Sequence, residues 1–116
     1  MILGVGIDMV KIEKMETAIN KWGSHFIDRI FNSEELEKIT PGKIYYQRLA
    51  ARFAAKEAVI KATSKNFSLA LKDILILNKE NGAPYCKFVK KLDVDVLLSI
   101  THIKDYAAAC AVAQKI

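Results

Sequence analysis

The chain has 116 residues, of which 52% are hydrophobic, and it carries a formal net charge of +5. This length predicts a single domain, residues 1–116, with material for one core but not for a deep, enclosed ligand cavity. A large ligand is therefore expected in a surface groove or between subunits, and the positive charge favours an anionic partner. The apolar start, interrupted by Asp8, lacks the basic leader and cleavage site of a signal peptide, and no stretch is long enough to span a membrane.

The two cysteines, Cys86 and Cys110, stand among apolar neighbours and form no C-x-x-C pair. They are typical of free thiols in a reducing compartment, so we expect a cytoplasmic protein. Only His25 and His102 could join them at a metal ion, and the spacing of these residues fits no zinc pattern.

Residues 2–10 predict a strand because their side chains alternate in size. The bulky face of this strand holds Leu3, Val5 and Ile7, and the almost bare face holds Gly4, Gly6 and Asp8. We expect the bare face to leave room beside the Asp8 carboxylate for something other than a side chain.

Residues 11–31 predict helix with a break near Gly23, because apolar residues recur at helical spacing on both sides of that glycine. Asn32 and Glu35 form the sequence pattern of a capping box, which predicts a short helix over residues 33–39.

Residues 44–64 give the strongest helical pattern of the chain, since they are rich in alanine and contain no glycine or proline. At 100° per residue, two apolar stripes fall on opposite sides of this helix, which is typical of a central helix. Arg52 and Lys56 lie between the stripes on one side. Glu57 and Lys61 lie between them on the other, where only small alanines flank the pair.

Residues 73–79 and 85–89 predict a hairpin around the Asn81-Gly82 turn. Residues 96–101 and 106–113 predict two further strands joined by a short loop. Strands at both ends of a helical middle favour an α+β domain, in which a small antiparallel or mixed sheet packs against a long central helix.

Asp8 and Glu57 are the first candidates for chemistry, because each carboxylate sits on a face of small residues. Such a pair suits Mg²⁺, which keeps several waters and takes one or two protein carboxylates together with substrate phosphates. The alternative is that Glu57 pairs with Lys61 one turn along, worth about 0.2–0.5 kcal/mol, while Asp8 caps the following helix. On spacing alone, that alternative is the commoner arrangement.

Three further groups suit the binding of an anionic ligand. Lys61 is a compact cation for a phosphate oxygen, with the one-turn salt bridge as its alternative. Arg52 and Lys56 either bind phosphates or form a solvated helix face. His102 follows an apolar strand at a loop entry, where binding residues are frequent, although a lone histidine is more often structural; Thr101 adds a hydroxyl beside it.

Four blocks, in order along nearly the whole chain, resemble those of the holo-acyl-carrier-protein synthases. The first block, GVGIDMV at 4–10, resembles their G-x-G-x-D opening. The second, RFAAKEA at 52–58 followed by Lys61-Ala62, resembles their signature R-F-A-A-K-E-A-x-x-K-A. The third, NGAP at 81–84, resembles their N-G-x-P turn, and LSITH at 98–102 with DYA at 105–107 resembles their last block.

The resemblance implies a 4′-phosphopantetheinyl transferase fold and its reaction. A serine hydroxyl of apo acyl carrier protein would attack the β-phosphorus of coenzyme A, and adenosine 3′,5′-bisphosphate would leave. By the same resemblance, Asp8 and Glu57 would bind Mg²⁺, and Lys61 would lie against the phosphates and assist the leaving group. These three residues form the implied catalytic set.

The resemblance also implies how the substrates are held. Arg52, Thr101 and His102 would contact coenzyme A, chiefly at its phosphorylated adenosine end. The protein would assemble as a homotrimer with each site between two subunits. Acyl carrier proteins of this class are acidic, so Lys11, Lys14 and, more weakly, Arg29 would attract the carrier, with fatty acid biosynthesis as the default pathway.

Two departures from the family pattern stand out. Members commonly carry a glycine-rich turn soon after the second lysine of the signature, whereas residues 63–67 here read TSKNF. Members also often carry arginine at the position of Lys14, and lysine keeps the charge but loses the bidentate fork. Both changes concern binding more than the reaction.

Three rival functions remain open from the sequence. A small basic nucleic-acid-binding module is allowed by the charge, but it would give the carboxylates no purpose and no RNA-binding signature is present. A Mg²⁺-dependent phosphohydrolase would use the same carboxylates with water as acceptor. A non-catalytic descendant is disfavoured by the intact Glu57 and Lys61.

Overall fold

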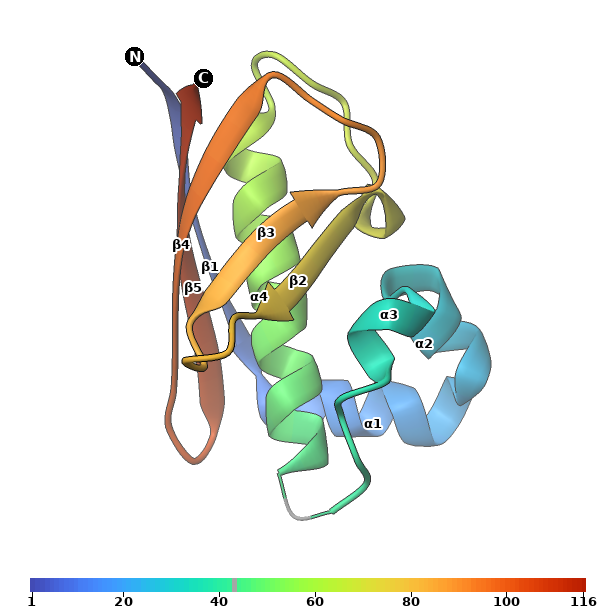
Figure 1. Ribbon diagram of the computed structural model, residues 1–116. Coiled ribbons are helices and arrows are strands. Elements are labelled where there is room, and N and C mark those ends of the chain that lie inside the picture. The colour runs from blue at the N-terminus through green and yellow to red at the C-terminus, as the bar shows by residue number, and fades with distance from the viewer. Residues whose placement is uncertain (43) are drawn as a thin grey trace.

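A computed structural model describes residues 1–42 and 44–116 (Figure 1). A three-stranded antiparallel sheet, in the order β1-β5-β4, packs against the long helix α4, and a two-stranded antiparallel hairpin, β2-β3, lies beside that helix. The strands and this helix are β1 (Ile2–Lys11), α4 (Tyr45–Thr63), β2 (Ile74–Asn78), β3 (Pro84–Phe88), β4 (Val94–His102) and β5 (Tyr106–Lys115). This arrangement confirms the predicted α+β fold, with every strand pair antiparallel.

Three short helices precede α4 and lie at one end of it (Figure 1). They are α1 (Ile12–Trp22), α2 (Ser24–Ile30) and α3 (Ser33–Leu36), and the turn η1 (Leu71–Asp73) leads into β2. The predicted break falls at Gly23, whose φ of 59° is a left-handed conformation that glycine adopts without strain. The predicted capping box of Asn32 and Glu35 is present.

The helix predicted over residues 33–39 is too long, since α3 ends at Leu36. The N–H of Ile39 bonds to the carbonyl of Leu36 at 3.1 Å, which is the tighter i→i+3 turn of a helix end. Thr40 precedes Pro41, and a residue before proline is biased away from the helical region. The chain therefore turns inward after α3 and buries Ile39.

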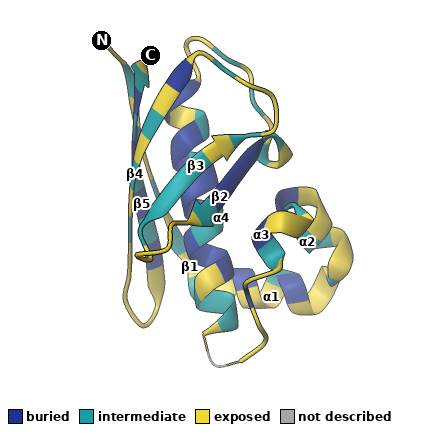
Figure 2. Ribbon diagram, in the orientation of Figure 1, coloured by how far each residue is buried: buried dark blue, intermediate teal, exposed yellow. Residues whose placement is uncertain are grey.

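Helix α4 is central, as its two apolar stripes predicted (Figure 2). The side of the helix that meets the sheet carries small residues: Ala54, Ala58 and Ala62 lie in the same core cluster as Ala109, Ala111 and Ala113 of β5. The side that meets α1 and the end of α2 carries residues such as Leu49 and Ala51. Small side chains on both surfaces let the helix lie close to the sheet.

The glycine face of β1 packs directly on α4. A Cβ added at Gly4 would overlap the carbonyl oxygen of Ala62, and one added at Gly6 would overlap that of Ala58. The small residues at Gly4 and Gly6 therefore let the α4 backbone approach β1 closely. Asp8, at the end of this face, stays partly exposed.

A Gly6→Ala variant is expected to lose about 3 kcal/mol of stability, the upper end for overpacking, because backbone rather than a flexible side chain blocks the methyl group. Gly42→Ala is the matched control, since nothing lies within 4 Å of the position of its Cβ. Chemical denaturation of both variants measures the effect, and equal stability of the two would contradict this account of the β1–α4 packing.

The opposite face of the three-stranded sheet is apolar and uncovered in the single chain. Val5, Ile7 and Met9 of β1 are 62%, 68% and 66% exposed. Leu97 of β4 extends the same face, because Leu97 and Val5 both pair with Val112 of β5. Tyr106 of β5 also lies on this face, because it pairs with Lys11, two residues after Met9 on β1. A contiguous apolar surface of this kind marks an interaction site.

The prediction that Lys56 binds phosphates or lies on a solvated helix face is wrong. Its side chain is fully buried, and its ammonium forms an ion pair with the equally buried carboxylate of Glu35. Burial lowers the pKa of Lys56, while the hydrogen bond and charge of Glu35 act against that shift. Lys56 is therefore part of the core and does not line the pocket that its helix neighbour Arg52 lines.

Candidate active site

Asp8, Glu57 and Lys61 come together where β1 crosses α4. The Lys61 ammonium donates to the Ile7 carbonyl at 2.9 Å and to Asp8 Oδ1 at 3.3 Å. Among the described residues, the salt bridge of Lys61 is this cross-element pair with Asp8 and not the one-turn pair with Glu57. Asp8 does not cap the following helix either, because α1 begins after Lys11 and has no side-chain cap.

The pKa of Glu57 is raised from its ordinary value. Burial is the largest cause, the negative charge of Asp8 adds to it, and Lys61 acts in the opposite direction. Two carboxylates thus share one partly exposed lysine, which leaves their mutual repulsion incompletely balanced. A bound cation would relieve that repulsion.

This donor set fits Mg²⁺ better than a metal that needs a full protein cage. Within residues 1–42 and 44–116, no group of three or more His, Cys, Asp or Glu side chains is placed to hold a metal ion. Mg²⁺ is commonly held by one or two carboxylates plus substrate phosphates and water, and Asp8 and Glu57 supply that number of oxygen ligands.

Glu57 is expected to titrate above its ordinary value of 4.5 in the metal-free protein. Because the folded state then holds this proton more tightly than the unfolded chain, the contribution of Glu57 to stability falls as pH rises from 4.5 through the raised pKa. Asp8→Asn should lower the Glu57 pKa, and Lys61→Met should raise it further. Carboxyl NMR titrations in chelator test this, and a Glu57 pKa unchanged by Asp8→Asn would refute the proximity of the two groups.

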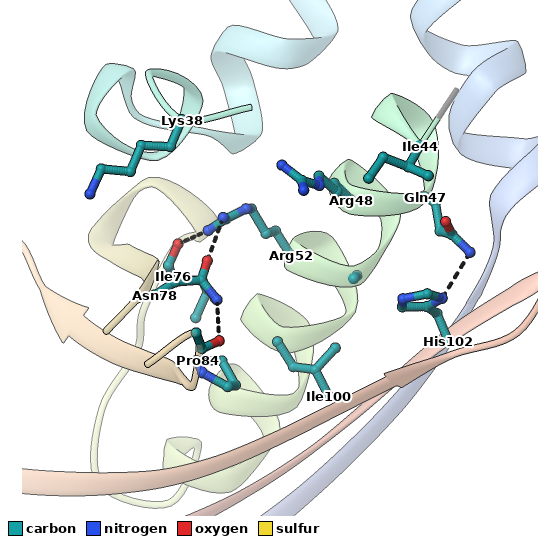
Figure 3. Close-up of a pocket in the computed structure, with 12 residues that line it drawn as sticks. Lys38, Ile44, Gln47, Arg48, Arg52, Ile76, Asn78, Pro84, Ile100 and His102 are labelled. Atoms are coloured by element: carbon teal, nitrogen blue, oxygen red, sulfur yellow. Dashed lines mark hydrogen bonds between the residues drawn. The ribbon is translucent and has the colours of Figure 1, made fainter. Parts of the chain in front are cut away.

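Arg52 and His102 face a separate pocket of about 640 Å³ between α4, the β2-β3 hairpin and β4 (Figure 3). Arg52 donates to the carbonyl of Ile76 and, at 2.7 Å, to Oδ1 of Asn78. His102 Nδ1 lies 2.8 Å from the side-chain amide of Gln47. That amide also donates to a backbone carbonyl, so Nδ1 accepts the hydrogen bond and Nε2 is left as the donor.

Two further cations line this pocket, Lys38 and Arg48, and sequence reasoning missed both. Arg48 stands one helical turn before Arg52, so the i, i+4 spacing could have indicated that the two share a face. Lys38 lies in the irregular segment after α3, where no pattern marks its direction. The pocket thus gathers positive charge and suits an anionic ligand.

Thr101 does not share this pocket. It precedes His102 on β4, and successive strand residues face opposite sides of a sheet. Thr101 is therefore on the uncovered apolar face, together with Leu97.

The residues predicted for carrier docking lie at the other end of the site. Lys14 lines a groove of about 440 Å³ together with Asp8, Lys11, Phe26 and Phe53. Arg29, on α2, is exposed but is not among the residues that line this groove.

The glycine-free segment after Lys61 forms a compact end to α4. The N–H groups of Asn66 and Phe67 both bond to the carbonyl of Thr63, at 3.0 and 2.9 Å. Among the described residues, positive φ angles occur only at glycines, so this turn needs no left-handed residue.

The predicted site residues fall into two groups in one chain. Asp8, Glu57 and Lys61 form one group, and none of them lines the pocket that holds Arg52 and His102.

No helix of the described part of the chain is long and apolar enough to cross a membrane.

Comparison with known proteins identifies the class to which this fold and site belong. The model of the 4′-phosphopantetheinyl transferase superfamily matches residues 4–111, which is nearly the whole chain. The chain is therefore a member of that superfamily.

Curated relatives narrow the class. A holo-[acyl-carrier-protein] synthase of Protochlamydia amoebophila is 40% identical over 119 residues, covering 97% of this chain and 98% of that protein. The synthase of Thermodesulfovibrio yellowstonii is 38% identical over 112 residues, with the same coverage. Within the superfamily, the chain belongs to the holo-[acyl-carrier-protein] synthase family.

Solved structures agree with this assignment. A holo-(acyl-carrier-protein) synthase from Bacillus anthracis, in complex with CoA (3′,5′-ADP), superposes with a TM-score of 0.85 at 32% identity, covering 100% of this chain and 99% of that one. The synthase of Helicobacter pylori, in complex with coenzyme A, gives a TM-score of 0.80 at 26% identity, covering 95% of this chain and 99% of that one.

Proposed function

We propose that this protein transfers the 4′-phosphopantetheine group of coenzyme A to a serine of apo acyl carrier protein and releases adenosine 3′,5′-bisphosphate. The observation that carries the proposal is the Asp8–Lys61–Glu57 cluster beside an open groove in a chain of this family. The serine oxygen forms a bond to the β-phosphorus, the bond from that phosphorus to the bridging oxygen breaks, and the serine proton leaves to a nearby base.

Asp8 and Glu57 are the residues that would hold Mg²⁺. When bound, the ion supplies charge neutralisation and orientation at the pyrophosphate of coenzyme A. The protein's own contribution is position and electrostatics. Lys61 reaches across from α4 to β1, so its ammonium contacts the Asp8 carboxylate and its charge acts on Glu57. From there it can hold a phosphate oxygen as the leaving group departs.

Arg52 and His102 would bind the phosphorylated adenosine end of coenzyme A. Their pocket carries the cations and hydrogen-bond donors that such a group needs, with Arg48 and Lys38 as further cations. This pocket and the carboxylate cluster do not share lining residues in one chain. One coenzyme A would therefore lie across two subunits, with each subunit giving one half of the site.

A homotrimer would supply that arrangement. The uncovered sheet face of Val5, Ile7, Met9 and Leu97 provides the apolar area that a subunit interface requires. Thr101 lies on this same face, so in an assembly it would sit at the boundary between subunits, near the ligand end of a neighbour. Closed cyclic symmetry gives every subunit the same pair of half-sites.

Carrier docking would use the groove beside Asp8. The exposed cations Lys11 and Lys14 line it, the exposed Arg29 is on α2, and an acidic carrier is attracted to such cations. The apolar side chains of Phe26 and Phe53, which also line it, suit the apolar contacts of a docked helix. We propose the acyl carrier protein of fatty acid synthesis as the acceptor and the cytoplasm, where free cysteines persist, as the location.

The release of adenosine 3′,5′-bisphosphate from coenzyme A tests the reaction class. We expect release with apo carrier, and none without carrier or with a carrier whose acceptor serine is replaced by alanine. Release at the same rate in all three samples would instead identify a phosphohydrolase that uses water as acceptor.

A further inference from the structure

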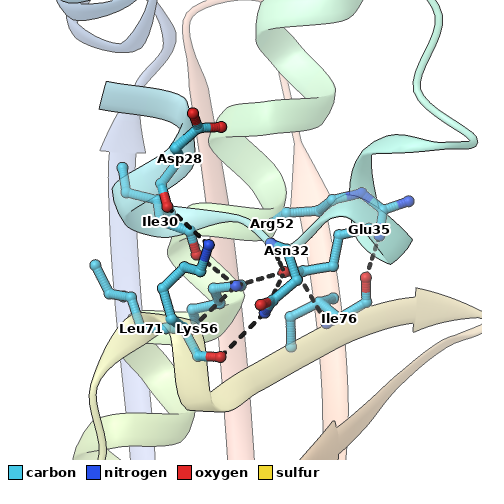
Figure 4. Close-up of polar contacts among 9 residues, drawn as sticks. Asp28, Ile30, Asn32, Glu35, Arg52, Lys56, Leu71 and Ile76 are labelled. Atoms are coloured by element: carbon cyan, nitrogen blue, oxygen red, sulfur yellow. Dashed lines mark hydrogen bonds and ion pairs between the residues drawn. The ribbon is translucent and has the colours of Figure 1, made fainter. Parts of the chain in front are cut away.

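A buried ion pair lies between the helical region before α4 and α4 itself (Figure 4). The Lys56 ammonium is fully buried and donates to three oxygens. These are Glu35 Oε1 at 2.5 Å, the Ile30 carbonyl at 2.6 Å and the Leu71 carbonyl at 3.1 Å. All three N–H donors of the lysine are thus satisfied, from three different segments of the chain.

Glu35 is equally fully engaged. Its Oε1 accepts from the backbone N–H of Asn32 at 3.0 Å, which closes the capping box of α3. Its Oε2 accepts from the backbone N–H of Ile76 on β2 at 2.9 Å. The carboxylate therefore ties α3, the buried lysine and the β2 strand to one another.

Ile76 links this network to the ligand pocket. Its N–H donates to Glu35, while its carbonyl accepts from the guanidinium of Arg52. Both polar groups of Ile76 are therefore turned away from the partner strand β3, the N–H toward α3 and the carbonyl toward α4. Asn78, two residues along β2, receives the second Arg52 hydrogen bond, so the same strand edge holds both arms of the guanidinium.

Stability alone does not account for a pair of charges at this depth. Both ions have lost their water, and well-packed apolar residues of similar volume often give equal or greater stability in such places. Arg52 and Lys56 stand one helical turn apart on α4. Arg52 bonds to Ile76 directly, and Lys56 is linked to Ile76 through Glu35. Through the bond from the Ile76 N–H to Glu35, the ion pair also holds the edge of β2 that faces away from β3.

We propose that the Glu35–Lys56 pair is a positioning device for the ligand pocket: it holds the Ile76 peptide in place, so that Arg52 presents its remaining N–H donors to the anionic end of the nucleotide. Two arms of the guanidinium are fixed by Ile76 and Asn78, and a guanidinium has five N–H donors in all. This inference rests on the function proposed above and assigns Glu35 and Lys56 to affinity for the nucleotide rather than to phosphoryl transfer.

A double-mutant cycle on nucleotide binding tests the proposal. The Glu35→Gln/Lys56→Met variant removes both charges together, so that neither ion is left buried and unpaired. We expect it to bind adenosine 3′,5′-bisphosphate about tenfold more weakly in calorimetry, a change of about 1.4 kcal/mol. Arg52→Ala should weaken binding at least as much, and the triple variant should bind no more weakly than Arg52→Ala alone, because the network acts through Arg52.

Lys91→Met is the matched control, since it removes an exposed lysine that does not line the pocket. Independent losses that add in the triple variant would overturn the positioning role, and so would undiminished binding by the Glu35→Gln/Lys56→Met variant. Absence of nucleotide binding by the wild-type protein would overturn the proposed function itself, and this inference with it.

A measurement on the wild-type protein needs no variant. If the Glu35–Lys56 pair fixes its supports, the Arg52 side chain is already ordered before any ligand binds. Nitrogen-15 relaxation of the Arg52 guanidinium in the ligand-free protein should give an order parameter typical of rigid backbone, about 0.85. A value below about 0.6, typical of a flexible group, would contradict the inference.

Discussion

Replacing Glu57 with glutamine is expected to lower kcat by about 10²-fold or more and to leave the protein folded. The change removes one of the two carboxylates that would hold the ion, and the stabilisation of developing charge is lost with it. The fold should be kept because Glu57 forms no ion pair in the described structure and is repelled by Asp8. Initial rates over a Mg²⁺ titration, with thermal unfolding alongside, provide the measurement.

Glu80→Gln is the matched control for this loss, because Glu80 is exposed in the turn between β2 and β3. It makes the same chemical change far from the carboxylate cluster and should keep full activity. A Glu57→Gln variant with wild-type kcat and an unchanged Mg²⁺ dependence would refute the assignment of Glu57 to the metal.

If the proposed homotrimer forms through the uncovered sheet face, replacing Leu97 with aspartate is expected to dissociate it and to abolish activity. Leu97 is 55% exposed in the single chain, so the charge is tolerated in a monomer, but it would be buried without a partner in a subunit interface. Sedimentation should give a particle near the chain mass of 13.0 kDa in place of one three times larger. Val89→Asp, which alters an exposed apolar residue outside this sheet face, should leave both assembly and activity unchanged.

Mixing two impaired variants distinguishes a shared site from a loss of folding. If each site takes its carboxylates from one subunit and its pocket from the next, mixed trimers of Glu57→Gln and Arg52→Ala contain intact sites. Random mixing in equal amounts should leave about a quarter of the sites intact, so the mixture should be more active than either variant alone at low coenzyme A. No recovery after exchange of subunits would mean that each chain holds a complete site.

The elements were largely predictable because their signals are local. Alanine content defines α4, Gly23 defines the break after α1, and the spacing of Asn32 and Glu35 defines the start of α3. The end of α3 was not predictable from the capping pattern, because it depends on how the chain before Pro41 turns inward to bury Ile39.

The position of Lys56 was not predictable from the helical pattern for a different reason. A helical projection gives the direction of a side chain but not what covers it, and the partner of Lys56 is Glu35, 21 residues earlier in the chain. The same limit applies at Lys61, whose nearest carboxylate along the helix is Glu57 but whose salt bridge is to Asp8, 53 residues away. Only the crossing of β1 over α4 decides between them.

The candidate site was predictable where it follows the family motifs and not elsewhere. Asp8, Glu57 and Lys61 come together as the resemblance implied. The cations Lys38 and Arg48 lie outside the motifs, and the carbonyl of Ile76 that supports Arg52 leaves no sequence signal, because every residue has one.

The mass of an acyl carrier protein after incubation with this protein tests the proposed function most directly. Purified protein, coenzyme A, apo carrier and Mg²⁺ are combined with and without a chelator, and the carrier is weighed by mass spectrometry. A gain of about 340 Da on the carrier, lost when the chelator is present, is the result expected for phosphopantetheine transfer. An unchanged mass with several apo carriers, from a folded protein that binds coenzyme A, would contradict it.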